Sequence, residues 1–495
     1  MLYQSTRNKN LTATSTQAVL HGLAPDGGLY VLPDLKALSF DWRSALQKDV
    51  RGMAASILGT LLPDYEDMPE LVRRAYDGKF ETDDLTPLAK VGEDYILELF
   101  RGPTSAFKDV ALSMLPQLMT AARKQEGIDD EIVILTATSG DTGKAALAGF
   151  CDVEGIKILV FYPDQGVSAV QKAQMVTQEG KNVGVCAIRG NFDDAQTGVK
   201  TVFSRVENEN LLKGKGVRLS SANSINIGRL APQVVYYFKA YADLVKQGRI
   251  QIGDPVDYVV PTGNFGDILA GYFAKELGLP VGKLVCASNA NDVLTEFIRT
   301  GRYNRVRPFH KTYSPSMDIL VSSNLERLLF YVSGGDDAKI ADLMAQLKEN
   351  GEYRVDGAML SSIQDQFWAG CCDDGATQET IGKVWKDFGY LCDTHTGVAW
   401  TVAQQYKKER SGNAPVVVLS TASPYKFPVA VLEAIGEDVS GSEFAVMDRL
   451  YETTKVPVPQ QLATLRSRSV RHTDVIDRET ILDYVLEKVS RKDWA

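Results

Sequence analysis

The sequence predicts an α/β protein in which parallel-rich sheets are flanked by helices, with an α-rich domain at the N-terminus. Short apolar runs rich in valine, isoleucine and leucine end in loops of small residues, and each loop opens a helix-like segment, as in residues 131–150, 257–278, 283–297 and 414–436. Near-continuous apolar strands that alternate with helices are typical of a parallel sheet covered on both faces. Because ligands bind at the carboxyl ends of such strands, we expect the functional residues in these loops.

The composition restricts the class of protein. The chain has 495 residues, too many for one simple core, and carries a net charge of −9. A general nucleic-acid binder needs a basic surface, so we expect no nucleic-acid partner. No apolar run approaches the length of a membrane span, and the first ten residues lack the apolar core of a signal peptide. We expect no membrane partner, and a monomer, because no stretch has the pattern of a self-association helix.

The cysteines and histidines restrict the chemistry. The six cysteines are scattered and form no C-x-x-C pair, which predicts reduced thiols and a cytoplasmic location. None of the four histidines pairs with another at metal-ligand spacing: His21, His310, His395 and His472. We therefore expect no metal site and no Ser-His-Asp site, and we assign proton transfer to Lys, Asp, Glu or Tyr.

Three regions follow one another along the chain. Residues 1–95 are predicted to form the α-rich leading domain, in which the turn at 25–28 separates a helix-like piece from a short strand. Residues 96–435 contain the repeated strand–loop–helix pattern, with a smaller subdomain at about 105–225 inserted in the larger one. Residues 436–495 are predicted to be a helical, charged flank.

Lys108 is the centre of the stretch RGPTSAFKDVAL. Thr104 or Ser105 is expected to cap a helix whose first turn contains Lys108. Apolar neighbours and the positive end of the helix dipole both disfavour the ammonium form, so the pKa of Lys108 should fall below its ordinary ~10.4. A neutral lysine amine is a Schiff-base nucleophile. The alternative is a lysine that only covers apolar surface at a helix end.

Two loops could bind anions. TGNFGD, at residues 262–267, follows a strand and opens a helix, so its backbone N–H groups can surround a phosphate. The alternative for this loop is an ordinary strand–helix turn. TSGDTGK, at residues 138–144, fails as a Walker A loop because Thr138 replaces the first glycine and Ala145 follows the lysine. It can still present hydroxyl and N–H groups to a carboxylate, although Asp141 would also serve as an ordinary helix cap.

Two further loops carry polar groups. STASPYKFP, at residues 420–428, follows a strongly apolar strand and places the Thr421 hydroxyl at the strand end. SANSINIGR, at residues 221–229, is either a polar turn or an anion clamp. A lysine with reason to be neutral, a phosphate site, a second anion site and a strand-end hydroxyl together suit pyridoxal phosphate.

The motifs PTSAFKD, TSGDTGKAAL, GNFGDILAG and TASPYKF, in this order, resemble the threonine synthase family, within the tryptophan-synthase-β-like group of pyridoxal-phosphate enzymes of fold type II. YQSTRN and GLAPDGGLY are similar to the leading domain of that family. The resemblance covers nearly the whole chain.

The resemblance implies roles for individual residues. Lys108 would form the Schiff base with the cofactor, Thr421 would face its pyridine nitrogen, and Asp141 would lie near its ring oxygen. The cofactor phosphate would be held by Gly263, Asn264, Phe265, Gly266 and Asp267. The substrate would be bound by Ser139, Gly140, Thr142, Asn223, Ser224, Arg229 and Lys426, with Asp141 beside its carboxylate and Lys172 as a further candidate for its phosphate.

The reaction that the resemblance implies converts O-phospho-L-homoserine and water to L-threonine and phosphate, with Lys108 as the base in successive steps. Alternatives remain open. A serine/threonine dehydratase or a phospholyase of the same fold would give a 2-oxo acid instead of threonine. A non-catalytic binder of a phosphorylated metabolite would take up no pyridoxal phosphate.

Overall fold

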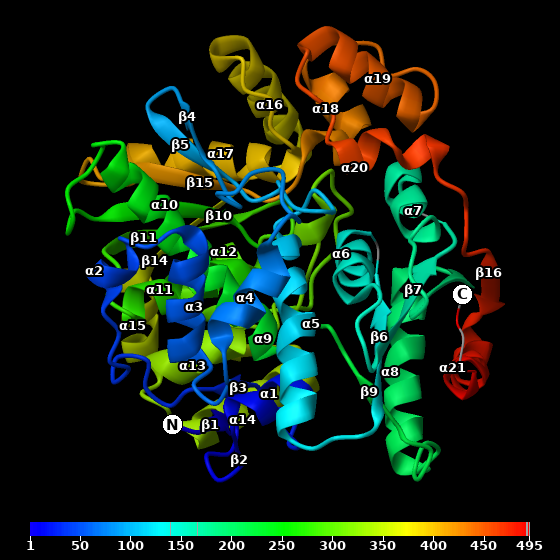
Figure 1. Cartoon of the computed structure of the whole chain (residues 1–495). Coiled ribbons are helices and arrows are strands. Elements are labelled where there is room, and N and C mark those ends of the chain that lie inside the picture. Colours follow the sequence, from blue (N-terminus) through cyan, green and yellow to red (C-terminus); the bar gives the residue numbers. More distant parts are fainter. Residues whose placement is uncertain (139, 166, 492–493, 495) are drawn as a thin grey trace.

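The computed structural model describes residues 1–138, 140–165, 167–491 and 494. It contains two parallel-rich sheets, each covered by helices, and a leading region whose helices pack on the helices Lys108–Gln125 and Val234–Lys246 (Figure 1). The predicted α/β class is therefore confirmed. The helix α5 (Lys108–Gln125) runs between the two halves.

The larger sheet is parallel except at one edge, where β4 and β5 form an antiparallel pair. Its strands, in spatial order, are β14 (Phe367–Cys371), β11 (Val281–Ser288), β10 (Val256–Pro261), β15 (Val416–Ser420), β5 (Asp94–Glu98) and β4 (Leu88–Val91). Alternate residues enter separate cores: Val259 and Val418 pack on the side of α17 (Thr394–Glu409), and Tyr258 lies on the side of α10 (Val234–Lys246) and α11 (Gly266–Glu276). Burial on both faces explains why the central strands are apolar at most positions rather than at alternate ones.

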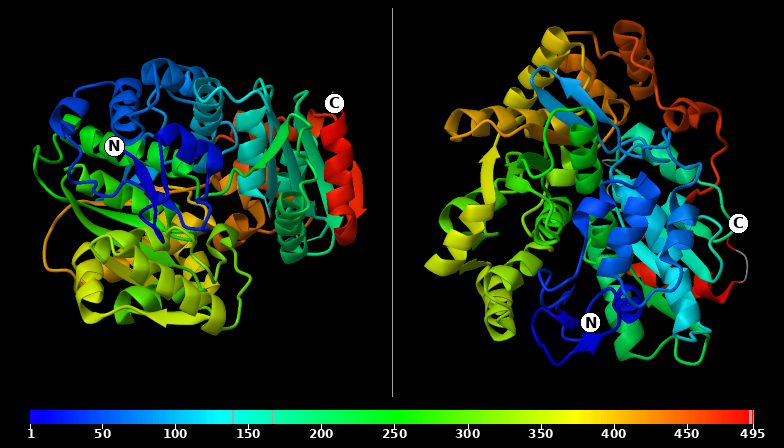
Figure 2. Two further views of the ribbon diagram at one scale, coloured as in Figure 1. Left: turned by 90° about the horizontal axis from the view of Figure 1, so that it is seen from below. Right: turned by 60° about the vertical axis from the view of Figure 1, so that its left-hand side comes forward.

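The smaller sheet is parallel throughout and forms one end of the molecule (Figure 2). Its strands, in spatial order, are β16 (Asp474–Asp477), β8 (Val183–Arg189), β7 (Ile156–Pro163), β6 (Glu131–Ala137) and β9 (Val217–Ser220). One face packs on α5 and α6 (Asp141–Phe150), and the other packs on α8 (Phe192–Asn208) and α21 (Ile481–Ser490). The helix α7 (Ala169–Val176) follows β7 and contacts α6.

The edge strand β16 comes from the C-terminal flank, for which the sequence predicts only helices. It pairs in parallel with β8, with Asp474 opposite Cys186. The flank is otherwise helical, with α18 (Pro428–Ala434) just before it and then α19 (Glu443–Thr454), α20 (Gln460–Ala463) and α21. It therefore completes the smaller sheet in addition to covering it.

The leading region combines a small antiparallel sheet with four helices. Its elements are β1 (Tyr3–Ser5), β2 (Thr12–Ala13), α1 (Ser15–His21), β3 (Tyr30–Val31), α2 (Trp42–Ala45), α3 (Val50–Leu61) and α4 (Met68–Tyr76). Two adjacent charged residues of α13 (Leu325–Val332) anchor it. The Glu326 carboxylate accepts hydrogen bonds from Thr6 Oγ1 (2.5 Å) and from the Arg7 guanidinium (2.8 Å), and Arg327 Nε donates to the Tyr30 carbonyl (3.0 Å).

The remaining elements surround the larger sheet. They are α9 (Ile227–Leu230), α12 (Val293–Thr300), β12 (Arg302–Asn304), α14 (Asp337–Asn350), β13 (Glu352–Arg354), α15 (Gly357–Gln366) and α16 (Asp374–Phe388). Among the helices described, none is long and apolar enough to cross a lipid bilayer.

Candidate active site

Lys108 is the first residue of α5, but the expected cap is wrong. Phe107 occupies the N-cap position without a side-chain hydrogen bond, and Ser105 has a left-handed backbone with φ of 61°. Instead, the Asp109 carboxylate accepts hydrogen bonds from the backbone N–H (2.8 Å) and the hydroxyl (2.5 Å) of Thr104. Asp109 therefore fixes the loop that presents Lys108.

The surroundings of Lys108 favour its neutral amine. Burial lowers its pKa to about 8, and Arg229 and Lys426 act in the same direction, whereas Asp141 opposes them. This is the direction that the sequence predicted. The side chain keeps partial access to solvent, and its Nζ donates to Ser316 Oγ at 3.4 Å. A partly neutral and accessible amine can attack an aldehyde near neutral pH.

The strand end that carries Thr421 lies against the Lys108 loop. The Phe107 backbone N–H donates to the Thr421 carbonyl (2.8 Å), and Ala106 pairs with Ala422 as an isolated bridge. Thr421 itself is buried. A strand end of the larger sheet and the first turn of α5 are therefore joined through main-chain bonds.

The loop at 263–267 can offer main-chain groups to an anion. Its left-handed residue, Phe265, has φ of 61° and packs its ring 5.7 Å from that of Phe367. The Asp267 carboxylate accepts hydrogen bonds from the hydroxyls of Tyr236 (2.5 Å) and Tyr237 (3.1 Å). Burial raises the pKa of Asp267 to about 7. Both side chains are buried, although Asp267 Oδ2 has no hydrogen-bond partner among the described residues, and the N–H groups at the start of α11 are left for a phosphate.

Gly263 lies in close contact with another segment. A Cβ at this position would be 2.4 Å from the Ser316 carbonyl oxygen, so a larger residue would displace one of the two segments. Asn264 is exposed, and its carbonyl accepts hydrogen bonds from the backbone N–H and the side chain of Asn324, both at 3.1 Å. The loop is thereby held from the side of α13.

Asp141 and Lys426 form a buried ion pair of 2.5 Å, and both side chains are almost fully inaccessible. Gln171 Nε2 also donates to Asp141 (3.0 Å), and Lys426 Nζ donates to the Thr104 carbonyl (3.2 Å). Although burial acts to raise it, Lys426 and Lys108 hold the pKa of Asp141 well below its usual range. Asp141 thus contributes negative charge beside Lys108 and neutralises Lys426.

Arg229 is a buried cation with an incomplete set of partners. Its Nη1 donates to the Ala222 carbonyl (2.9 Å), its Nε has no hydrogen-bond partner, and it has no carboxylate partner within the described part of the chain. Burial lowers its pKa to about 10. A buried guanidinium with a free N–H favours an anionic ligand.

Of the other predicted substrate residues that the structure describes, all but the buried Gly140 have side chains with access to solvent. Asn223 is exposed, and Ser224 donates its hydroxyl to it (3.2 Å). Lys172 is 45% exposed and lies 3.8 Å from Asp164. Gly140 and Thr142 lie at the start of α6, whereas Ser139 falls outside the described residues. The predicted roles of all these residues stay predictions.

Thr138, to which we had assigned no function, organises the start of α6. Its hydroxyl accepts hydrogen bonds from the N–H groups of Gly140 (3.0 Å) and Gly143 (2.9 Å). A hydroxyl that satisfies two N–H groups at a helix start acts as a cap. This role could have been inferred from a threonine directly after a strand.

Three residues that the sequence analysis missed also lie here: Ser316, His395 and Asp393. Ser316 belongs to the turn Pro315–Met317 and contacts Lys108, and its backbone N–H donates to His395 Nε2 (3.2 Å). His395 Nδ1 lies 2.7 Å from the Asp393 carboxylate. In the sequence, only the position of His395 at the start of an apolar helix could have pointed to it.

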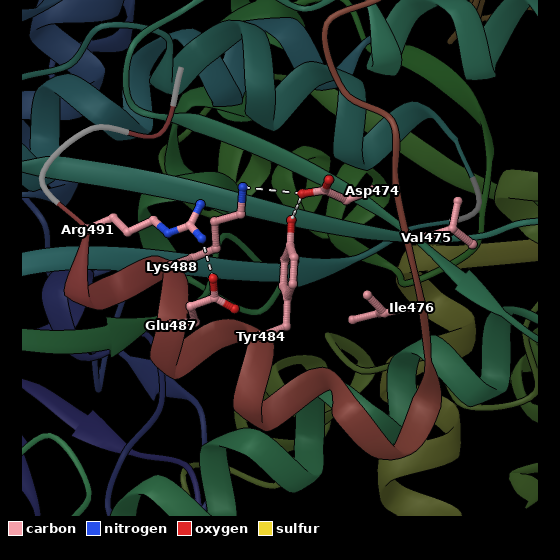
Figure 3. A pocket seen from close by; sticks show the side chains of 7 residues that line it. All are labelled: Asp474, Val475, Ile476, Tyr484, Glu487, Lys488 and Arg491. Carbon is pink, nitrogen blue, oxygen red and sulfur yellow. Dashed lines mark hydrogen bonds and ion pairs between the residues drawn. The ribbon is translucent and has the colours of Figure 1, made fainter.

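A surface pocket of about 240 Å³ lies far from these residues, between β16 and α21 (Figure 3). Its charged groups pair with one another: Asp474 contacts Tyr484 (2.5 Å) and Lys488 (3.3 Å), and Glu487 contacts Arg491. It therefore presents little free charge to a ligand. Within the described ranges, no three His, Cys, Asp or Glu side chains gather as a metal site.

The residues around Lys108 fit pyridoxal phosphate. The amine suits an aldehyde, and the N–H groups at the start of α11 suit a phosphate. The Arg229 guanidinium, whose Nε has no partner among the described residues, lies near enough to Lys108 to lower its pKa, and it can bind a second anionic group there. The lack of a side chain at Gly263 lets the 263–267 loop pack directly on Ser316, whose hydroxyl bonds Lys108.

Comparison with known proteins leads to the same cofactor. Family models match residues 2–76 (threonine synthase N terminus), 85–359 (pyridoxal-phosphate dependent enzyme) and 396–485 (threonine synthase, C-terminal). The threonine synthase of Pseudomonas aeruginosa is 39% identical, with 88% of this chain and 90% of that protein covered. Human threonine synthase-like 1 is also 39% identical, and the match covers 85% of this chain but only 58% of that relative. A solved structure of threonine synthase from Brucella melitensis, described as bound to pyridoxal phosphate, has a TM-score of 0.86 at 38% identity and covers 99% of this chain and 98% of its own.

Proposed function

Because the chain belongs to the threonine synthase family of pyridoxal-phosphate-dependent enzymes, we propose that it converts O-phospho-L-homoserine and water to L-threonine and phosphate. The observation that carries the proposal is the juxtaposition of two groups: an accessible lysine whose pKa is lowered to about 8, and a buried arginine with a free Nε that contributes to this lowering. The lysine can bind an aldehyde and act as a base, and the arginine can bind an anionic substrate.

Four parts of the chain would hold the cofactor. Lys108 would bind its aldehyde, the N–H groups from Gly263 to Asp267 its phosphate, and the Thr421 hydroxyl its ring nitrogen, with Asp141 near the ring oxygen. The bound cofactor would supply an electron sink for bonds that break at the substrate Cα and Cβ. A hydroxyl at the ring nitrogen cannot keep it protonated as a carboxylate would, which suits elimination and replacement better than transamination.

Lys108 moves the protons in this proposal. Once the substrate amine has replaced it, the neutral Nζ takes the Cα proton, passes it on, and is then free to take one Cβ proton. The phosphate leaves Cγ with its bonding electrons, the hydroxyl of water adds to Cβ while the phosphate takes up the remaining water proton, and one proton each is returned to Cγ and Cα to give threonine. A lysine suits this work because a pKa near 8 lets one nitrogen accept and release protons at neutral pH.

Charged groups orient the substrate. The N–H groups and hydroxyl at the start of α6, from Gly140 to Thr142, would hold the α-carboxylate, and Arg229 would hold the substrate phosphate, with Asn223 and Ser224 beside it. Lys426 can contribute only if substrate draws it from Asp141, since the two already form an ion pair. Asp141 limits the positive charge near Lys108 and so prevents its pKa from falling further.

The test is to incubate the purified protein with O-phosphohomoserine and to measure phosphate and threonine together. Equal amounts of both, lost in Lys108→Ala, are expected. Phosphate with a 2-oxo acid would instead identify a phospholyase, and a 2-oxo acid from serine or threonine a dehydratase. No uptake of pyridoxal phosphate would contradict the enzyme assignment.

We also propose that the enzyme is a cytoplasmic monomer. All six cysteines are free thiols in the structure, which suits a reducing compartment. Sedimentation of the holoenzyme should give the mass of one chain, and a stable dimer would contradict this part of the proposal.

A further inference from the structure

The turn Pro315–Met317 crosses the site between three groups that lie far apart in the sequence. Ser316 Oγ accepts a hydrogen bond from Lys108 Nζ (3.4 Å), and the Ser316 carbonyl lies against Gly263. The Ser316 backbone N–H donates to His395 Nε2 (3.2 Å). Each polar atom of Ser316 therefore faces a different element of the site.

His395 is held by hydrogen bonds at both of its ring nitrogens. Because Nε2 accepts a backbone N–H, the ring proton lies on Nδ1, which donates to Asp393 Oδ2 (2.7 Å). His395 is 2% exposed and Asp393 is 0% exposed. The ring centroid of Phe427 lies 5.1 Å from that of His395. The imidazole can hardly turn without losing one of its two bonds.

Asp393 is fixed in turn at the start of α17. Its carboxylate accepts hydrogen bonds from the N–H groups of His395 and Thr396, both at 3.0 Å, and from the Thr396 hydroxyl. A carboxylate at a helix N-terminus is stabilised by the helix dipole. A rigid helix thus supports the chain Asp393–His395–Ser316–Lys108.

We propose that Ser316 is a catalytic residue that orients the Lys108 nitrogen, and that His395 and Asp393 are positioning residues that hold Ser316 in place. A hydroxyl accepts a hydrogen bond from an ammonium and donates one to a neutral amine. Ser316 can therefore stay bonded to Lys108 while that nitrogen gains and loses a proton. The assignment rests on the proposed function only in taking Lys108 as the reactive lysine.

The first experiment separates the hydroxyl from the turn. Ser316→Ala removes Oγ but keeps the N–H that bonds His395, and Ser316→Thr keeps a hydroxyl. The readout is the rate at which apo protein captures pyridoxal phosphate on Lys108, followed by absorbance, together with kcat and KM. Ser333→Ala is the matched control, because the Ser333 hydroxyl bonds only nearby main-chain groups: it donates to the Phe330 carbonyl and accepts from the Asp336 N–H.

Ser316→Ala should slow capture and lower kcat about tenfold, the effect of one hydrogen bond, with KM within about twofold. Ser316→Thr should restore most of both, and Ser333→Ala should leave both unchanged. If Ser316→Ala captures the cofactor and turns over at the wild-type rates, the proposal is wrong.

The second experiment tests the support. His395→Gln can present an oxygen to the Ser316 N–H, whereas His395→Leu cannot. His395→Leu should reproduce the defect of Ser316→Ala, and His395→Gln should show a smaller defect. In a double variant, His395→Leu should lower the rates little beyond the effect of Ser316→Ala alone. His472→Gln, which removes a histidine near Gln178, is the control. Additive losses would show that His395 does not act through Ser316.

The capture assay needs no amino-acid substrate. If wild-type protein makes no threonine but the capture rates follow the expected order, the proposed function fails and the role of Ser316 stands. If threonine forms and Ser316→Ala changes neither the capture rate nor kcat, the proposed function stands and the role of Ser316 fails.

Discussion

The ion pair between Asp141 and Lys426 predicts that losing one partner is more damaging than losing both. After Asp141→Asn, the buried Lys426 ammonium loses its countercharge and keeps only neutral acceptors, the Thr104 carbonyl and the amide oxygen at position 141. An uncompensated buried charge of this kind costs about 3–5 kcal/mol in the free energy of unfolding. Asp141→Asn/Lys426→Met removes both charges and keeps an acceptor for Gln171, so it should lie within about 2 kcal/mol of wild type.

The assay is urea unfolding of the apo protein, followed by tryptophan fluorescence and by circular dichroism, because a chain of this size can unfold in steps. Arg205→Met serves as control, since it breaks only an exposed pair with Glu209 and should not change the midpoint. A double variant less stable than either single variant would refute the reasoning.

The pH dependence gives an independent check of the same pair. Asp141 has a lowered pKa in the folded protein, so its contribution is present above its unfolded pKa of ~3.9 and is lost as the pH falls through the lower folded value. The difference between wild type and Asp141→Asn should therefore not shrink between about pH 7.5 and 5.5, and it should grow somewhat because the variant lacks the carboxylate that holds up the pKa of Lys108. A difference that already shrinks between these two values would contradict a depressed pKa.

Three further predictions concern the cofactor and substrate groups. Gly263→Ala should weaken pyridoxal phosphate binding at least about tenfold, because its Cβ would collide with the Ser316 carbonyl oxygen. The control Gly59→Ala, which has open space around it in α3, should bind the cofactor as wild type does. Equal affinities of the two variants in an absorbance titration would contradict this prediction. Arg229→Met should raise KM for O-phosphohomoserine about 10- to 100-fold in steady-state assays, and an unchanged KM would exclude Arg229 as a phosphate ligand. Capture of pyridoxal phosphate by apo protein should accelerate as the pH rises through about 8, where Lys108 loses its proton, and a rate independent of pH in stopped-flow mixing would show that its pKa lies elsewhere.

The strand–loop–helix pattern predicted the architecture because burial on both faces leaves a direct trace in the sequence. It brought Lys108, the 263–267 loop and Thr421 to one region for the same reason. The pattern did not reveal the side chains' directions: Phe265 and Asp267 face the interior, and Lys426 pairs with Asp141. These directions depend on tertiary partners that are remote in the sequence.

Ser316 and His395 were missed for different reasons. Ser316 lies in an irregular segment without periodicity, and its contacts reach across 208 residues to Lys108 and 79 residues to His395. His395 was set aside because no second histidine accompanies it, yet its partner is a backbone N–H, which leaves no trace in the sequence. The strand β16 was missed because its four residues are mostly exposed and two of them are aspartates, so that only pairing with β8 makes it a strand.

The late position of β16 has a consequence for synthesis on the ribosome. Arg189 of β8 and its partner Asp477 in β16 are 288 residues apart, so at ~5–20 residues per second β8 waits about 15–60 s for its neighbour. During that interval a hydrophobic strand edge is open to other nascent chains. We expect the smaller sheet to be the part of the chain that needs chaperone protection longest, and slower elongation between β8 and β16 to increase aggregation.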